Sequence, residues 1–358
     1  MRITFILPVV NLSGGIRVIS IYAKALSDRG HEVTLISPPP PYPSVKTVFK
    51  SLLVNGRLPR YQRFTESHLD NLGLRHIVLE KFRPVEDFDV PDGDIVIATF
   101  WLTAEWVENL SQAKGKKVYF VQGHETHEGF PIERVKRTLR NDFTKIVVSE
   151  WLRGILEEEY QQKNVILIPN GIDTNLFSSA PRTKPKSCTI GFIFSEMPVK
   201  NCAYAIRILN SAVNKHSLNV VAFGAEPPVN LKLPSNIRFH LRPNQSEIVK
   251  IYRQCTAWLS TSRSEGFGLP LLEAMACRTP VLGTPTGAAP ELLSNGGGEL
   301  IPPDNIEEAT NALVRFCRMD EETWSKHSTE AYNKAKQYDW GKSIQLFEDT
   351  LLSLCNSR

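Results

Sequence analysis

Two glutamates, Glu265 and Glu273, frame a segment with the composition of a ligand-binding loop that runs into a helix. Gly266 and Gly268 allow a tight turn and a close approach of the backbone to a ligand. Pro270 suits the first turn of a helix, where its missing N–H costs nothing. Apolar residues then recur at helical spacing, at Leu269, Leu272 and Ala276. We therefore predict a helix N-terminus whose free amides, at residues 267 to 271, can bind a phosphate.

The separation of the two glutamates indicates what they can do. Helical rise places Glu265 and Glu273 at most about 12 Å apart, which is too far for one acid/base pair acting on one bond. The separation suits two carboxylates that bind hydroxyl groups on different parts of one long ligand, on either side of a phosphate. A nucleotide sugar is such a ligand. The alternative is a solvated helix face, and the spacing alone does not exclude it.

The residues themselves carry a family resemblance. Glu-Gly-Phe-Gly-Leu-Pro at 265–270, followed by Glu-Ala-Met-Ala at 273–276, resembles the Glu-x7-Glu motif of glycosyltransferase family 4. Pro-Asn-Gly-Ile-Asp at 169–173 is similar to the start of that family's interdomain linker. The resemblance covers about residues 2–35 and 90–350. It implies an α/β protein of the GT-B fold, in which two doubly wound Rossmann-like domains face each other across a cleft.

The resemblance assigns roles to individual residues. Lys200 would stabilise the donor diphosphate, Glu265 would hold hydroxyls of the donor sugar, and Glu273 would bind the ribose. His124 follows a strand of the first domain and would lie beside the sugar, with His127 as the alternative. We expect the catalytic residues to be Glu265, His124 and Lys200.

The expected donor site includes further residues. The family usually has an Arg about five residues before Lys200, but Phe194 and Ser195 stand there. Arg263 is the candidate replacement, and Arg278 stands where the family commonly has Gly. The expected donor-binding set is Gly14, Gly15, Lys200, Arg242, Arg263, Glu265, Gly266, Phe267, Gly268, Leu269 and Glu273.

The opening of the chain has the pattern of a β-α-β unit. An apolar strand at 2–10 is followed by the Gly14-Gly15 turn, a helix at 16–29 and a second strand at 31–37. A dinucleotide site is excluded, because it needs Gly-x-Gly-x-x-Gly and an acidic residue after the second strand. Gly14-Gly15 resembles instead the family loop that faces the donor phosphate or the acceptor.

The length of 358 residues predicts two domains. We place the first, acceptor-side domain at 1–171 and the donor-binding domain at 172–339. The amphipathic segment 340–358 resembles the GT-B helix that crosses back and completes the first domain. The alternative is a helix that packs on its own domain.

Composition and charge limit the kinds of partner and site that the chain can have. The net charge of +4 is too small to imply nucleic-acid binding. The six cysteines include no Cys-x-x-Cys pair, so we expect neither a disulfide framework nor a cysteine metal site, and a reducing cytoplasm fits. The segment 46–83 holds eight Lys or Arg residues against three acidic ones and could contact an anionic membrane or a charged acceptor. The alternative is a solvated loop with a helix packed on the sheet.

The acidic strings Asp87-Phe88-Asp89 and Asp92-Gly93-Asp94 match the Asp-x-Asp of metal-dependent glycosyltransferases of another fold. Both precede a predicted strand at 95–100, whereas ligands of open parallel sheets lie beyond the carboxyl ends of strands. We therefore expect neither a metal site on the donor face nor a cofactor, and the sugar nucleotide would be a co-substrate.

The resemblance implies a retaining hexosyltransferase that acts on a growing or lipid-linked polysaccharide in the cytoplasm or at the inner face of the plasma membrane. UDP-glucose leads as the donor, with GDP-mannose and other UDP-hexoses behind it. Two alternatives remain open: a non-catalytic nucleotide-sugar binding protein, and a sugar-nucleotide epimerase of the same fold.

Overall fold

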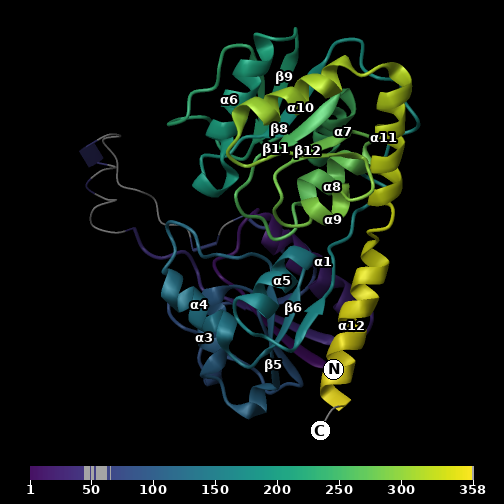
Figure 1. The fold of residues 1–358 in the computed structure, drawn as a ribbon. Helices are drawn as coiled ribbons and strands as arrows, with labels where there is room; N and C mark the ends of the chain where they lie inside the picture. The colour runs from purple at the N-terminus through teal and green to yellow at the C-terminus, as the bar shows by residue number, and fades with distance from the viewer. Residues whose placement is uncertain (44–48, 50–51, 54–62, 65, 357–358) are drawn as a thin grey trace.

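The chain forms two parallel β-sheets, each covered by helices, as Figure 1 shows. The structure is a computed structural model that describes residues 1–43, 49, 52–53, 63–64 and 66–356. The first sheet has the strand order β3-β2-β1-β4-β5-β6-β7. Its strands are β1 (Arg2–Ile6), β2 (Glu32–Ser37), β3 (Arg75–Val78), β4 (Ile95–Ala98), β5 (Lys116–Val121), β6 (Thr144–Val147) and β7 (Val165–Leu167).

The second sheet has the strand order β10-β9-β8-β11-β12-β13. Its strands are β8 (Thr189–Ile193), β9 (Asn219–Gly224), β10 (Ile237–Leu241), β11 (Ala257–Ser260), β12 (Val281–Gly283) and β13 (Gly298–Leu300). In each sheet the strand order reverses once, between β1 and β4 and between β8 and β11. Ligands of doubly wound sheets bind beyond the carboxyl ends of the strands at this point.

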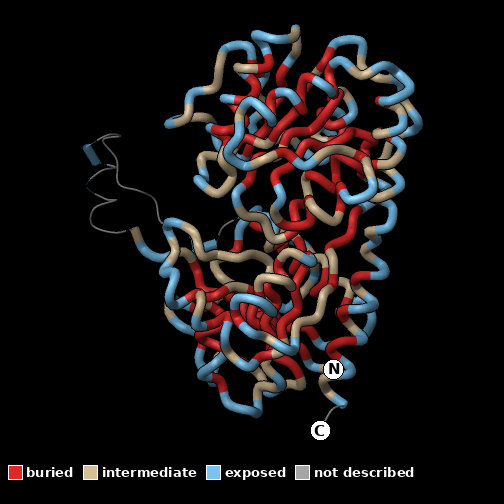
Figure 2. The backbone as a smooth tube through the Cα atoms, viewed as in Figure 1, coloured by how far each residue is buried: buried red, intermediate tan, exposed pale blue. Residues whose placement is uncertain are grey.

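Helices cover both faces of the two sheets because the strands are apolar on both faces. All residues of β4 are buried, as expected for the centre of a parallel sheet. In Figure 2, buried residues fill the centre of each of the two units that a sheet and its helices form. The helices are α1 (Gly14–Asp28), α3 (Trp101–Glu108), α4 (Ile132–Arg140), α5 (Glu150–Glu158), α6 (Cys202–Val213), α7 (Gln245–Gln254), α8 (Leu269–Ala276), α9 (Ala289–Leu293), α10 (Ile306–Arg318), α11 (Glu321–Ala335) and α12 (Trp340–Asn356).

The last helix, α12, crosses back onto the first sheet, as predicted, and lies beside it in Figure 1. Phe347 is fully buried and stacks on Tyr22 of α1, with the ring centroids 4.4 Å apart. His31 Nε2 lies 2.7 Å from a carboxylate oxygen of Glu348. We call the first sheet, its helices and α12 the N-terminal lobe, and the second sheet with its helices the C-terminal lobe.

The chain crosses between the lobes twice, and the two crossings lie against each other. The Ile172 amide donates to the Tyr338 carbonyl at 3.0 Å, and Ile172 forms a parallel bridge with Asp339. A Cβ at Gly171 would lie 2.4 Å from the Trp340 amide nitrogen, so only glycine allows the two segments to approach this closely.

One expectation from the cysteines was wrong. The structure joins Cys188 and Cys317 by a disulfide, and these residues are 129 positions apart. The pairing arises because the amino end of β8 and the last turn of α10 meet in the fold. Sequence spacing carries no information about such a contact.

The predicted basic segment 46–83 falls largely outside the described residues. Its described part includes β3, which forms the edge of the first sheet beside β2. Arg83 is paired with Asp89 at 2.6 Å. Within the described residues, no helix is both long enough and apolar enough to span a bilayer.

Candidate functional site

Two residues predicted to act on different parts of a donor contact each other in the C-terminal lobe. Lys200 ends a short 3-10 helix after β8, and Glu265 lies in the loop after β11. Lys200 Nζ is 2.6 Å from Glu265 Oε1. The Ser262 hydroxyl donates to the same oxygen at 2.7 Å. The ion pair borders a small cavity at the switch point of the second sheet, with Thr261 and Trp258 also in its wall.

The helix predicted after this loop forms as α8. Gly268, its N-cap, has a φ of 92°, which favours glycine. The amides of the first turn of α8 come directly after the loop that carries Glu265, and they can donate hydrogen bonds to an anion. The Phe267 side chain is buried against the Tyr338 ring, with the ring centroids 5.8 Å apart, so the predicted donor contact of Phe267 would have to come from its backbone.

Gly266 lies at a close contact between the lobes. A Cβ added there would lie 1.6 Å from the carbonyl oxygen of Gln122, at the end of β5. The Gly266 carbonyl accepts a hydrogen bond of 2.7 Å from the Ser149 hydroxyl, also in the N-terminal lobe. The structure thus places Gly266 at a contact between the lobes, and its expected approach to a ligand stays a prediction.

Gly14 and Gly15 begin α1, so they lie in the first turn of that helix and not in a separate loop. A Cβ at Gly15 would lie 3.7 Å from the Gln122 side-chain amide, whereas one at Gly14 would have no neighbour within 4 Å. Gly15 and Gly266 thus both lie close to Gln122, where the two lobes meet. Its predicted contact with a donor phosphate or an acceptor stays a prediction.

Glu273 lies within the protein and bridges the lobes. Its side chain is 7% exposed, and Oε1 pairs with Arg17 Nη1 of α1 at 2.8 Å. Its Oε2 accepts a hydrogen bond of 3.0 Å from the Tyr252 hydroxyl. Burial raises the pKa of Glu273, while Arg17 opposes the shift. Binding of ribose by Glu273 remains a prediction, and it requires the carboxylate to exchange these partners.

His124 and Arg263 line one cavity of about 290 Å³ that both lobes border. His127, Trp151 and Ser264 also line it. His124 Nε2 lies 2.9 Å from the Tyr160 hydroxyl, and burial lowers the pKa of the imidazole, which is therefore mostly neutral at pH 7. The cavity gives His124 access to a ligand beside Glu265, which follows Ser264 directly.

Of the two arginines predicted to bind the donor, Arg263 lines the cavity between the lobes and Arg242 does not. The Arg263 amide donates to the Val199 carbonyl at 2.8 Å, which places the Arg263 backbone beside the residue that precedes Lys200. Arg242 is exposed, and its Nε donates to the Ala225 carbonyl at 2.7 Å. Arg242 is not among the residues lining either cavity of the described structure. Its role in donor binding stays a prediction.

Sequence reasoning missed several residues of the site. Arg17 and Tyr252 carry no motif, and only the packing of α1 and α7 against α8 reveals them. Glu125 follows His124, and burial raises its pKa to about 8, so at neutral pH it is mostly protonated and can donate a hydrogen bond. Trp151 lies in the first turn of α5, and a tryptophan in a helix is ordinarily a core residue, so its type alone did not mark it as part of a cavity wall.

The acidic strings before β4 have partners at the amino edge of the first sheet. Asp89 pairs with Arg83, and Asp87 accepts a hydrogen bond of 2.8 Å from the Ser111 amide. Asp92 pairs with Lys114 at 2.8 Å, and Asp94 accepts from the Arg2 amide at 2.7 Å. These carboxylates stabilise loops at the edge opposite the cleft.

Family models match both lobes. The model described as "Glycosyltransferase Family 4" matches residues 12–176, and the one described as "Glycosyl transferases group 1" matches residues 178–337. Together they span most of the chain.

Individual relatives match over shorter segments. A probable sucrose-phosphate synthase of Thermosipho melanesiensis is 26% identical over 193 residues, which are 49% of this chain and 44% of that relative. The O-antigen chain mannosyltransferase RfbU of Salmonella typhimurium is 33% identical over 97 residues, which are 25% of this chain and 28% of that relative. The chain thus matches less than half of the length of either.

Solved structures share the whole fold. A sucrose-phosphate synthase from Thermosynechococcus elongatus superposes with a TM-score of 0.72 at 15% identity, over 100% of both chains. HepE of Anabaena, solved with UDP and glucose, gives a TM-score of 0.70 at 19% identity, over 99% of this chain and 100% of that one. With two doubly wound lobes and both family models matched, the chain belongs to glycosyltransferase family 4 and has the GT-B fold.

Proposed function

We propose that this glycosyltransferase is a retaining hexosyltransferase that uses a nucleotide diphosphate sugar, with UDP-glucose as the leading donor. GDP-mannose and other UDP-hexoses follow. The acceptor is a hydroxyl of a growing or lipid-linked polysaccharide, such as an exopolysaccharide. The UDP and glucose in HepE support the donor class, and the name of the O-antigen mannosyltransferase supports a sugar-polymer acceptor.

The observation that carries this proposal is the ion pair of Lys200 and Glu265 beside the first turn of α8. A donor diphosphate would take Lys200 and the α8 amides as its partners, because it carries more negative charge than one carboxylate. Glu265, still held by Ser262, would then accept hydrogen bonds from the sugar hydroxyls. Lys200 would then bind the diphosphate and Glu265 the sugar, which are the roles predicted from the sequence.

The proposed reaction assigns a role to each of these groups. The bond between the anomeric carbon and the diphosphate oxygen breaks, and the acceptor oxygen bonds to the same face of that carbon. The acceptor proton moves to the departing phosphate oxygen, so no protein nucleophile is needed. Lys200 and the α8 amides stabilise the charge that develops on the diphosphate, where fixed donors are most effective. Neutral His124 contributes a hydrogen bond beside the sugar.

The cavity of about 290 Å³ is the proposed place of the acceptor sugar and the transferred hexose. Trp151 offers an aromatic face, and Arg263 offers a cation for a phosphate. Apolar side chains near the basic segment 46–83 support a lipid-linked acceptor at a membrane surface. Five of the described apolar side chains of this segment, Phe49, Leu52, Leu53, Phe64 and Phe82, are exposed.

The test is a donor screen followed by a matched variant. UDP-, GDP-, ADP- and dTDP-sugars are compared by thermal shift, where a true donor at 100 times its Kd stabilises by about 2.7 kcal/mol. Glu265→Gln should then reduce transfer to a model saccharide by at least about 10²-fold, with UDP affinity unchanged within a few-fold, because its contacts are to the sugar.

Other outcomes of the screen support other functions. Tight donor binding without transfer or hydrolysis supports the non-catalytic binding protein. Conversion of the donor sugar into its epimer supports the epimerase. The anomeric configuration of the product, read by NMR, decides between retention and inversion.

Transfer should not depend on a metal ion. The Asp-x-Asp carboxylates already bind arginine, lysine and backbone amides at the opposite edge of the sheet. We expect full activity in excess EDTA, measured on protein with the Cys188–Cys317 disulfide intact. Asp87→Asn should leave the rate within a few-fold, and Asp89→Asn should lower only the free energy of unfolding. Loss of turnover in EDTA that manganese or magnesium restores would reverse this assignment.

A further inference from the structure

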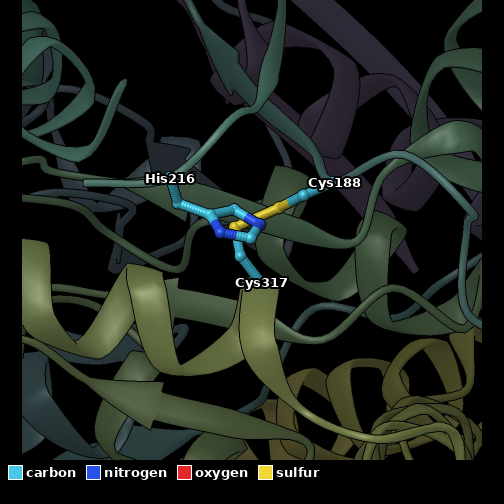
Figure 3. A group of neighbouring side chains, drawn as sticks. All are labelled: Cys188, His216 and Cys317. Atoms are coloured by element: carbon cyan, nitrogen blue, oxygen red, sulfur yellow. A yellow bond between two sulfur atoms is a disulfide. The ribbon is translucent and has the colours of Figure 1, made fainter. Parts of the chain in front are cut away.

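Three potential metal ligands meet at the amino edge of the second sheet, far from the cleft. Cys188 directly precedes β8, His216 follows α6, and Cys317 lies in the last turn of α10. Figure 3 shows the imidazole of His216 lying against the two sulfurs. One ligand atom from each residue lies within 4.8 Å of the others, and both cysteines are buried. Within the described part of the chain, this is the one such group of three.

Contacts other than the disulfide hold the three segments in place. Lys184 Nζ donates to the Cys317 carbonyl at 2.7 Å and to the Met319 carbonyl at 2.6 Å. The Cys188 carbonyl accepts from the Asn219 amide at 2.8 Å, which fixes Cys188 beside β9. These bonds involve backbone groups and do not require the two sulfurs to be joined.

The turn that carries His216 is fixed in the same way. The His216 amide donates to the Ala212 carbonyl at 2.8 Å, and Arg318 Nη2 donates to the Lys215 carbonyl at 3.2 Å. Lys215 Nζ also reaches Asn311 of α10 at 3.1 Å. Opening the disulfide would therefore leave two thiols and an imidazole already together.

We propose that the reduced protein binds a zinc-class divalent cation through Cys188, His216 and Cys317. Two thiolates and one imidazole form a ligand set that zinc prefers, and water would complete a tetrahedron. Zn–S bonds of about 2.3 Å place two tetrahedral sulfurs roughly 3.8 Å apart. The Cα atoms of the two cysteines are 5.4 Å apart, so side-chain rotation can separate the sulfurs without moving the backbone.

Charge and location agree with a structural role for the metal. Two thiolates neutralise a divalent cation, and ligand deprotonation on binding releases protons. The cluster lies before the amino end of β8, whereas Lys200 lies beyond its carboxyl end. The ion would join β8, α6 and α10 in place of the disulfide, and it would take no part in glycosyl transfer.

The disulfide and the metal are two states of the same residues. A water-soluble phosphine reduces the disulfide: phosphorus becomes the phosphine oxide with the oxygen of one water, and the two protons of that water go to the sulfurs. Zinc then displaces those protons. In the reverse direction, a peroxide takes two electrons from the thiolates and two protons from solvent, which yields the disulfide, two waters and free zinc.

The experiment titrates the whole chain with zinc chloride, and with cobalt chloride as a spectroscopic probe, before and after phosphine reduction. We expect one tightly bound ion per chain in the reduced protein and none in the oxidised protein. Cobalt should produce a thiolate-to-metal charge-transfer band and the intense visible bands of tetrahedral geometry. Reduced protein that takes up no metal, or that gives only octahedral cobalt, overturns the proposal.

Variants assign the ligands. Cys188→Ser should abolish binding, and His216→Ala should weaken it by more than the 10–100-fold typical of losing an outer-shell partner. Cys355→Ser is the matched control, because Cys355 is a free cysteine on α12, and it should bind like the wild type. Equal zinc affinity in wild type and Cys188→Ser, with circular dichroism showing that both are folded, would mean that the pair forms only a disulfide.

Discussion

Substitution of Gly266 by alanine should reduce transfer by at least about 10²-fold while UDP binding stays within a few-fold of wild type. The added Cβ would lie 1.6 Å from the Gln122 carbonyl oxygen, so one lobe must move away from the other. A shift of about 1 Å in reacting groups is enough for a loss of this size. The groups proposed to bind the nucleotide lie on the C-terminal lobe and should stay in place.

Gly154→Ala is the matched control for this experiment. A Cβ at Gly154 of α5 has no neighbour within 4 Å, so the activity of this variant should equal that of the wild type. Steady-state kinetics with the donor found in the screen, calorimetry with UDP, and the radius of gyration from solution scattering are the measurements. A Gly266→Ala protein with wild-type kcat would show that catalysis does not need this lobe contact.

The second large effect concerns the ion pair of Arg17 and Glu273. Glu273→Ala should lower UDP affinity by about 1.5–3 kcal/mol if the carboxylate binds ribose. It should also lower the free energy of unfolding by about 3–5 kcal/mol, since it leaves the partly buried charge of Arg17 without its partner. One variant thus mixes a binding effect with a stability effect.

A double variant separates the two effects. Arg17→Met/Glu273→Leu replaces the pair with apolar side chains, a change that is often neutral or stabilising for a buried ion pair. We expect chemical denaturation to show stability near that of the wild type, while calorimetry still shows the loss of UDP affinity. Tyr252→Phe is the control, because it removes one hydrogen bond to Glu273 and keeps the ring packing. Wild-type UDP affinity in the double variant would restrict Glu273 to joining the lobes.

A departure from the family pattern also has a structural account. Arg278 has a φ of 59°, a conformation that glycine adopts without strain, which explains why glycine is common there. In this chain its Nε donates to the Ser179 carbonyl at 2.9 Å, and its guanidinium lies 4.1 Å from the centre of the Tyr332 ring. These contacts offset the backbone strain and fix the segment between the lobes.

The order of the elements and the donor motif were predictable from the sequence because they depend on local chemistry. Apolar runs identified buried strands, and β1 and β2 lie within the predicted ranges 2–10 and 31–37. Gly268 and Pro270 marked the start of α8, since left-handed backbone and a first-turn proline are local requirements. The strand β3 was missed because Arg75–Val78 is a short edge strand inside a basic segment.

The contacts that join distant parts of the chain were decided only by the tertiary structure. Arg17 and Glu273 are 256 residues apart, and Cys188 and Cys317 are 129 apart. The glycine string at 265–270 shows that a close approach occurs, but not that the partner of Gly266 is Gln122. Sequence spacing determines neighbours within a helix or a strand, whereas these pairs form because two lobes pack against each other and a sheet edge meets a helix end.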